Sequence, residues 1–182
     1  MHSDLEDLLK ILIPITLKAR SDQHSHANIE ENDSKTKLNK ITISHIPSDT
    51  LVFQIDKHKG KLALMSSLFQ PTDFGHNKTC DALVVQRKDS SWVCLFIDLK
   101  SNKPSGFSAQ FKSTRCFWFY LKKLLESFGS CPDLPVTEHY LVINTGKSSK
   151  RPTTPKTKNK PEYPHFLKVN DNTSIPYSSL FL

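Results

Sequence analysis

Apolar residues recur at two different periods along the first part of the chain. Near the start they follow helical spacing, at Leu5, Leu8, Leu9, Leu12 and Ile13. Because these positions share one helix face, a first helix is expected there. Residues 20–38 are polar and predict a linker. Two β-rich runs at 40–46 and 50–55 then predict strands.

A hairpin is the clearest expectation in the middle of the chain. Residues 80–86 predict a strand, 88–91 predict a turn, and 92–100 predict a second strand. Because the connection is short, the two strands are expected to pair antiparallel. Residues 92–97 are apolar at every position, which is typical of a central strand covered on both faces.

One long helix and two further strands complete the order. Residues 107–128 follow helical spacing and Gly129 is the expected stop. The expected buried stripe of this helix consists of Phe111, Trp118, Leu121, Leu125 and Phe128. Residues 137–144 and 165–169 predict strands. The resulting order predicts an α/β fold with a mixed sheet, in a single domain of 182 residues.

The net charge is concentrated in one segment. The chain has 25 Lys and Arg against 18 Asp and Glu, a formal charge of +7. Six of the basic residues lie close together, at Lys147, Lys150, Arg151, Lys156, Lys158 and Lys160. Without them the remainder is nearly neutral, with 19 basic residues against 18 acidic ones. Residues 145–162 are therefore expected to form a flexible basic arm, which is either a solvated loop or a contact for nucleic-acid phosphates.

Several protein classes are excluded by composition. No apolar run approaches the roughly 20 residues that a membrane span requires. The start, Met1-His2-Ser3-Asp4, lacks the basic region of a secretory signal, so a cytoplasmic location is expected. The four cysteines are widely spaced and predict small buried side chains rather than disulfides or a zinc site.

Charged residues at the two ends of the predicted hairpin carry the chemistry. Asp81 stands near the start of the first strand, and Asp98-Leu99-Lys100 ends the second. Residues two apart in a strand share a face, so Asp98 and Lys100 lie on one side, and antiparallel pairing brings Asp81 towards them. Two carboxylates held close favour a cation between them, and Mg²⁺ suits such oxygen ligands. Asp98 and Lys100 would otherwise only mark where a buried strand reaches solvent.

This pattern resembles the PD-(D/E)XK nuclease superfamily, which has the restriction-endonuclease-like fold. The resemblance covers residues 81–144 and includes the Gln110-bearing helix that follows Lys100. It implies an αβββαβ core, with a mixed central sheet flanked by helices. Cys80 stands in place of the eponymous proline. Thr114 replaces the tyrosine of the Gln-x-x-x-Tyr pattern, which argues against the RecB-like exonuclease branch.

The resemblance implies a role for each residue of the pattern. Asp81, Asp98 and the backbone carbonyl of Leu99 would bind Mg²⁺, with Mn²⁺ as a substitute. Lys100 would position the attacking water, and Gln110 would support it. Some members of the superfamily add a glutamate from the first helix, where Glu6 is the candidate.

Two functions follow as expectations. The first is a metal-dependent nuclease that cleaves DNA rather than RNA, as an effector or subunit of a bacterial antiviral system. Lys112, Arg115 and the basic arm would then hold phosphates. The second is a catalytically silent subunit that binds nucleic acid or a larger partner protein. A homodimer is compatible with the first function, since cleavage of both strands often uses two active sites. The apolar end Leu180-Phe181-Leu182 either docks on a partner or folds onto the core.

Overall fold

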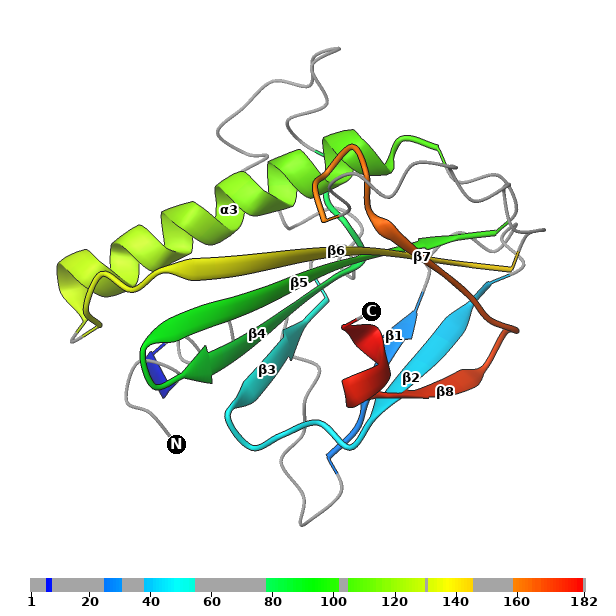
Figure 1. Cartoon of the computed structure of the whole chain (residues 1–182), viewed down its shortest axis with the longest axis horizontal. Coiled ribbons are helices and arrows are strands. Elements are labelled where there is room, and N and C mark those ends of the chain that lie inside the picture. Colours follow the sequence, from blue (N-terminus) through cyan, green and yellow to red (C-terminus); the bar gives the residue numbers. More distant parts are fainter. Residues whose placement is uncertain are drawn as a thin grey trace.

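The computed structural model shows a layered α/β protein (Figure 1). It describes residues 6–7, 25–30, 38–54, 78–101, 105–129, 131–145 and 159–181. Most of the expected first helix, the apolar stretch 61–69 and most of the basic arm lie outside these ranges. Within them, no helix is long and apolar enough to cross a membrane.

A five-stranded mixed sheet forms the centre of the protein. Its strands are β3 (Thr50–Phe53), β4 (Ala82–Lys88), β5 (Ser91–Lys100), β6 (Val136–Asn144) and β7 (His165–Lys168), in that spatial order. β3, β4 and β5 are antiparallel, whereas β5, β6 and β7 are parallel. The predicted hairpin and the mixed sheet are confirmed. β5 lies in the middle and is buried along most of its length, as its continuous apolar run predicts.

One face of this sheet is covered by α3 (Phe107–Phe128), which connects β5 to β6 (Figure 1). The bounds of α3 agree with the predicted helix. Phe111, Trp118, Leu121 and Leu125 pack into a core with the facing side chains of β4, β5 and β6. Phe128 belongs to the expected stripe, but the prediction that it is buried is wrong, because it is 87% exposed. It lies in the last turn, just before Gly129, where the helix ends.

The other face is covered by a second, three-stranded sheet. Its strands are β1 (Ala27–Glu30), β2 (Lys40–Ser44) and β8 (Thr173–Pro176), in the order β1-β2-β8. β2 pairs antiparallel with β1 and parallel with β8. The expected sheet flanked by helices is therefore wrong for the described residues. A helix covers one face and a sheet covers the other, because β1, β2 and β8 supply the apolar side chains that helices would have supplied.

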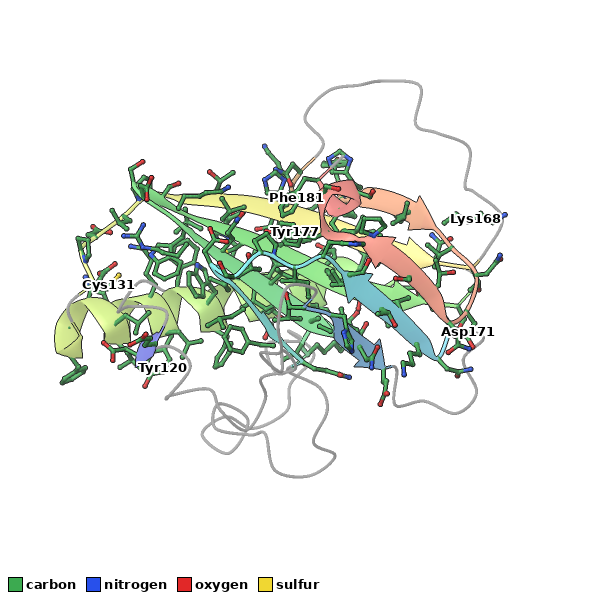
Figure 2. The ribbon with its side chains drawn as sticks, turned by 90° about the horizontal axis from the view of Figure 1, so that it is seen from below. Tyr120, Cys131, Lys168, Asp171, Tyr177 and Phe181 are labelled. Atoms are coloured by element: carbon green, nitrogen blue, oxygen red, sulfur yellow. The ribbon has the colours of Figure 1, made fainter. Side chains whose placement is uncertain are left out.

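Two segments without predicted structure belong to this second layer. β1 lies inside the expected linker, and Ala27 and Ile29 are buried in the core beneath it. The end of the chain forms β8 and the short 3-10 helix η2 (Tyr177–Leu180). Leu180 is buried, so this part of the expected docking segment folds onto the core. Figure 2 shows Tyr177 and Phe181 on the side of the five-stranded sheet opposite α3.

The described cysteines carry free thiols. Cys80, Cys94 and Cys131 are buried, as predicted, but Cys116 is exposed on α3. The end of the expected arm is also structured. The side chain of Asn159 accepts a hydrogen bond from the backbone N–H of Tyr140, and Lys160 forms an isolated β-bridge with Tyr163. The prediction of a flexible arm is therefore wrong at its carboxyl end.

Candidate active site

The two predicted acids meet where β4 begins and β5 ends. The register of the hairpin pairs Ala82 with Ile97, so Asp81 directly precedes the paired residues and lies across from Asp98. The carboxylate of Asp81 accepts a hydrogen bond from the backbone N–H of Leu99 at 2.5 Å. Opposed residues of antiparallel strands have Cβ atoms about 5 Å apart. The structure therefore brings the two acids together.

Both acids face the α3 side of the sheet. Leu83 on β4 and Phe96 on β5 pack in the core beneath α3, and alternate residues of a strand share a face. Asp81 lies two residues before Leu83, and Asp98 lies two residues after Phe96, so both acids share this face. Burial raises the pKa of the neighbouring Cys80 thiol, and the negative charges of Asp98 and Asp81 raise it further. Two carboxylates thus act on one neighbouring group.

Lys100 links the acids to the helix. Its ammonium lies 2.9 Å from Oδ2 of Asp98 and donates a hydrogen bond of 2.9 Å to Oε1 of Gln110. Gln110 lies in the first turn of α3, and its amide nitrogen donates to the backbone carbonyl of Thr79 at 3.1 Å. This chain of contacts joins β5, α3 and the segment that enters β4, and it holds the Lys100 side chain in place.

A second bond from α3 fixes the start of β4. The backbone N–H of Cys80 donates to the hydroxyl of Thr114 at 2.9 Å, and Thr114 is buried. Thr114 is one helical turn after Gln110, so both side chains point to the same segment. Gln110 and Thr114 together determine where Asp81 lies relative to Asp98.

The site is buried but reaches the surface through Lys100. Asp98 is fully buried and Asp81 is 4% exposed, whereas the side chain of Lys100 is 20% exposed. Burying a carboxylate is unfavourable unless it is paired, and the ion pair with Lys100 offsets part of that cost.

The donor set fits a hard divalent cation. Mg²⁺ is usually held by one or two carboxylates, with water and substrate phosphate completing its shell. Within the described ranges, no three or more His, Cys, Asp or Glu side chains gather closely enough to hold a metal ion. Two aspartates and a backbone carbonyl are oxygen donors, which suit Mg²⁺ or Mn²⁺ better than zinc, since zinc prefers nitrogen and sulfur ligands. Leu99 directly follows Asp98 and donates its backbone N–H to Asp81, and its side chain is buried on the opposite face of the sheet.

Glu6 does not belong to this site. Its neighbour Asp7 lies at the far end of α3, where its carboxylate is 3.6 Å from the position of a Cβ on Gly129. Gln110 and Gly129 are separated by about 28 Å at a rise of 1.5 Å per helical residue. The structure therefore places Glu6 at the far end of α3 from Asp81 and Asp98.

The predicted phosphate contacts lie elsewhere on the surface or outside the described residues. Lys112 pairs with Glu162 at 2.6 Å, and Arg115 pairs with Glu138 at 2.7 Å. Their side chains remain 57% and 44% exposed. Lys160 is exposed next to Glu162. The other five predicted contacts are outside the described ranges, namely Lys147, Lys150, Arg151, Lys156 and Lys158.

Two polar residues near the site were not predicted from the sequence. Asn144 ends β6 and pairs in register with Lys100, and Lys168 ends β7 and pairs with Asn144. Side chains alternate between the two faces of β6, and Asn144 lies on the same face as the apolar Tyr140 and Val142. This alternation could have indicated that Asn144 faces the site. A polar residue at a strand end is equally typical of the boundary of a strand.

Comparisons with protein-family models, with curated proteins and with solved structures found no match. The described part of the chain is a mixed α/β protein that holds two aspartates and a lysine together at one edge of its central sheet.

Proposed function

We propose that this protein is a metal-dependent nuclease that hydrolyses phosphodiester bonds of DNA endonucleolytically. The supporting observation is the cluster of Asp81, Asp98 and Lys100, in which Lys100 contacts both Asp98 and Gln110. The order β3, β4, β5, α3, β6 also supports the proposal, because it corresponds to the βββαβ part of a restriction-endonuclease-like core; β1 and β2 precede it.

Each residue has a distinct part in the proposed reaction. Asp81, Asp98 and the carbonyl of Leu99 would hold Mg²⁺ or Mn²⁺, which neutralises charge on the cleaved phosphate and lowers the pKa of a bound water. The partly exposed Lys100 ammonium orients the attacking water and stabilises negative charge that develops on the phosphate. Gln110 holds Lys100 in this orientation. Hydrolysis adds water across one phosphorus–oxygen bond and leaves a phosphate end and a hydroxyl end.

A second candidate is a catalytically silent subunit that binds nucleic acid or a larger partner protein. One observation favours it, because Lys100 already neutralises a fully buried Asp98. An ion pair of this kind can serve the fold alone. A metal would then have to compete with the lysine for the carboxylate.

A cleavage assay with matched variants separates the two candidates. The full chain is incubated with plasmid, linear duplex and single-stranded DNA and with RNA, each with Mg²⁺, Mn²⁺ or EDTA. Asp98→Asn removes the charge and keeps the shape of the side chain. Asp133→Asn is the matched control, since Asp133 has an 82% exposed side chain at the other end of the molecule.

The nuclease function predicts metal-dependent cleavage by the wild type and by Asp133→Asn. In Asp98→Asn, cleavage should fall by about a hundredfold or more, the scale of a group acting directly on the reaction. Cleavage that persists unchanged in Asp98→Asn contradicts the assigned site. Binding of nucleic acid without cleavage under either metal supports the silent subunit.

A further inference from the structure

The candidate site continues across the sheet onto β6 and β7. Lys100 pairs in register with Asn144, which pairs with Lys168, so these residues form one row across three parallel strands. The row behind it consists of Asp98, Val142 and Phe166. Neighbouring strands are about 4.8 Å apart, so each row extends about 10 Å from β5 to β7.

Both rows face the α3 side of the sheet. Val142 packs in the core beneath α3, and Asn144 continues its face. The ring of Phe166 meets the ring of Phe107, the first residue of α3, edge to face at 5.8 Å between centroids. Lys168 is two residues further along β7 and shares the face of Phe166. Figure 2 places Lys168 at the opposite end of the molecule from Cys131, which follows the carboxyl end of α3.

Asn144 carries an unsatisfied polar atom into this region. It is 6% exposed, and its side-chain oxygen is buried without a hydrogen-bond partner among the described residues. A buried acceptor left without a donor is unfavourable for the fold. An apolar residue at this position would avoid the cost, so the amide is better explained by a ligand that supplies the missing donor.

Phe166 and Lys168 provide the other contacts that a nucleic-acid strand requires. The Phe166 side chain is 43% exposed, although it belongs to the face that is otherwise covered by α3. Lys168 is exposed at the strand end. An exposed aromatic ring beside a basic side chain is the combination that binds unpaired nucleotides, since the ring stacks on a base and the cation meets the backbone.

We propose that Asn144, Phe166 and Lys168 form a subsite for the unpaired nucleotides that flank the cleaved phosphate. This inference rests on the proposed nuclease function, which leaves the substrate class open. Phe166 stacks on a base, Lys168 contacts a phosphate, and the Asn144 oxygen accepts a hydrogen bond from a nucleotide N–H or O–H. Stacking on Phe166 requires a base that is not stacked in a duplex, so the preferred substrate is single-stranded or frayed.

Binding in EDTA tests the subsite separately from cleavage. The full chain is titrated with short fluorescent oligonucleotides, single-stranded and duplex, of DNA and of RNA. Phe166→Leu removes the aromatic ring, and Phe128→Leu is its control, since Phe128 is an exposed phenylalanine at the other end of α3. Lys168→Gln is matched by Lys88→Gln, which changes another exposed lysine at a strand end.

The subsite predicts tighter binding of single strands than of duplexes by the wild type. Phe166→Leu should weaken single-strand binding by about tenfold, as expected for the loss of one stacked base. Lys168→Gln should lower the slope of log affinity against log salt by about one. Both control variants should bind as the wild type does. Asn144→Ala should weaken single-strand binding without lowering the melting temperature, which a purely structural asparagine would lower.

Different failures separate this inference from the proposed function. Unchanged single-strand affinity in Phe166→Leu and Lys168→Gln overturns the subsite, while cleavage that depends on Asp98 leaves the nuclease function intact. An equal loss of single-strand and duplex binding in Phe166→Leu overturns the preference for unpaired bases. Absence of any nucleic-acid binding or cleavage by the wild type overturns both proposals.

Discussion

The two ends of α3 each hold a lysine among acids, but the acids differ in origin and burial. At the amino-terminal end, Lys100 contacts Asp98 and Gln110. At the carboxyl-terminal end, Lys122 pairs with Glu126 one turn later and with Asp133 at 2.5 Å. Glu126 also pairs with Lys123 at 2.9 Å, so two bases meet two acids there.

The comparison distinguishes an ion cluster that the fold explains from one that it does not. Asp133 has an 82% exposed side chain. The pair of Lys122 with Glu126 is largely buried, at 9% and 11% side-chain exposure, but it has ordinary helical spacing. Such a cluster adds modest stability. At the other end, Asp81 and Asp98 are withdrawn almost completely from water. Burial of two carboxylates is costly for the fold, and the proposed metal site would account for that cost.

Replacing Lys100 and Lys122 in turn tests the difference between the two ends of α3, and the largest effect is expected here. Lys100→Met should lower metal-dependent cleavage by about a hundredfold, because the group that orients the water is lost. Lys122→Met should leave cleavage at the wild-type level, because that lysine is at the far end of the helix. Single-turnover cleavage rates measure both effects. Equal rates in the two variants would remove the distinction between the two ends.

The two glycines that flank α3 differ in what a Cβ would meet at each position. A Cβ on Gly129 would lie 2.7 Å from the carbonyl oxygen of Leu125, so Gly129→Ala forces backbone atoms apart and should lower the free energy of unfolding by about 1–3 kcal/mol. Gly106 has a φ of 77° and open space around it, so Gly106→Ala adds only left-handed strain, about 1–2 kcal/mol. Urea unfolding of both variants measures these changes.

The glycine variants also separate stability from activity. Gly106→Ala alters the start of the helix that carries Gln110, so cleavage should fall together with stability. Gly129→Ala should affect stability alone when cleavage is measured well below its melting temperature. An activity loss that follows stability in both variants would indicate that the first turn of α3 has no special role.

The smallest expected effect concerns the pH dependence of stability at the carboxyl end. Hydrogen bonds from Lys122 and Lys123 lower the pKa of Glu126. A carboxyl whose pKa is lower in the folded state stabilises the fold above its unfolded pKa, about 4.3, and this contribution is lost as pH falls through the folded value. Lys122→Met should remove about 0.5 kcal/mol at neutral pH and flatten the decline below pH 5 or so. Chemical unfolding at several pH values measures the slope, and an unchanged slope would contradict the assigned pairing.

Elements with strong local patterns were predictable from the sequence. α3 has an apolar stripe and ends at Gly129, and the β4–β5 hairpin has two apolar runs around a short turn. β1 and β8 were missed because each is four residues long and buries few side chains. Ile175 is the one buried residue of β8, and that strand forms because β2 accepts it as a partner. Such pairing depends on contacts that no local window contains.

The candidate site likewise contains residues that local sequence predicts and residues that only distant strand pairing brings in. Asp81, Asp98 and Lys100 belong to one hairpin, so their convergence follows from the length of the turn and the alternation of side chains. Asn144 and Lys168 reach the site only because β6 and β7 run parallel to β5, in a register that side-chain packing determines. The position of Glu6 relative to the site was not predictable, since the direction in which a first helix packs cannot be inferred from its own spacing.

The pairing of β2 with β8 has a consequence for how the protein is made. The backbone N–H groups of Asn39 and Lys40 donate to the carboxylate of Asp171 at 2.7 and 3.0 Å, across 132 and 131 residues of chain. At about 5–20 residues per second, a ribosome needs about 7–26 s to synthesise that interval. During this time β2 has an open edge and two isoleucines without their final cover, which invites pairing with other chains. The emerging polypeptide is therefore most prone to aggregation, and most dependent on chaperones, before Asp171 leaves the ribosome.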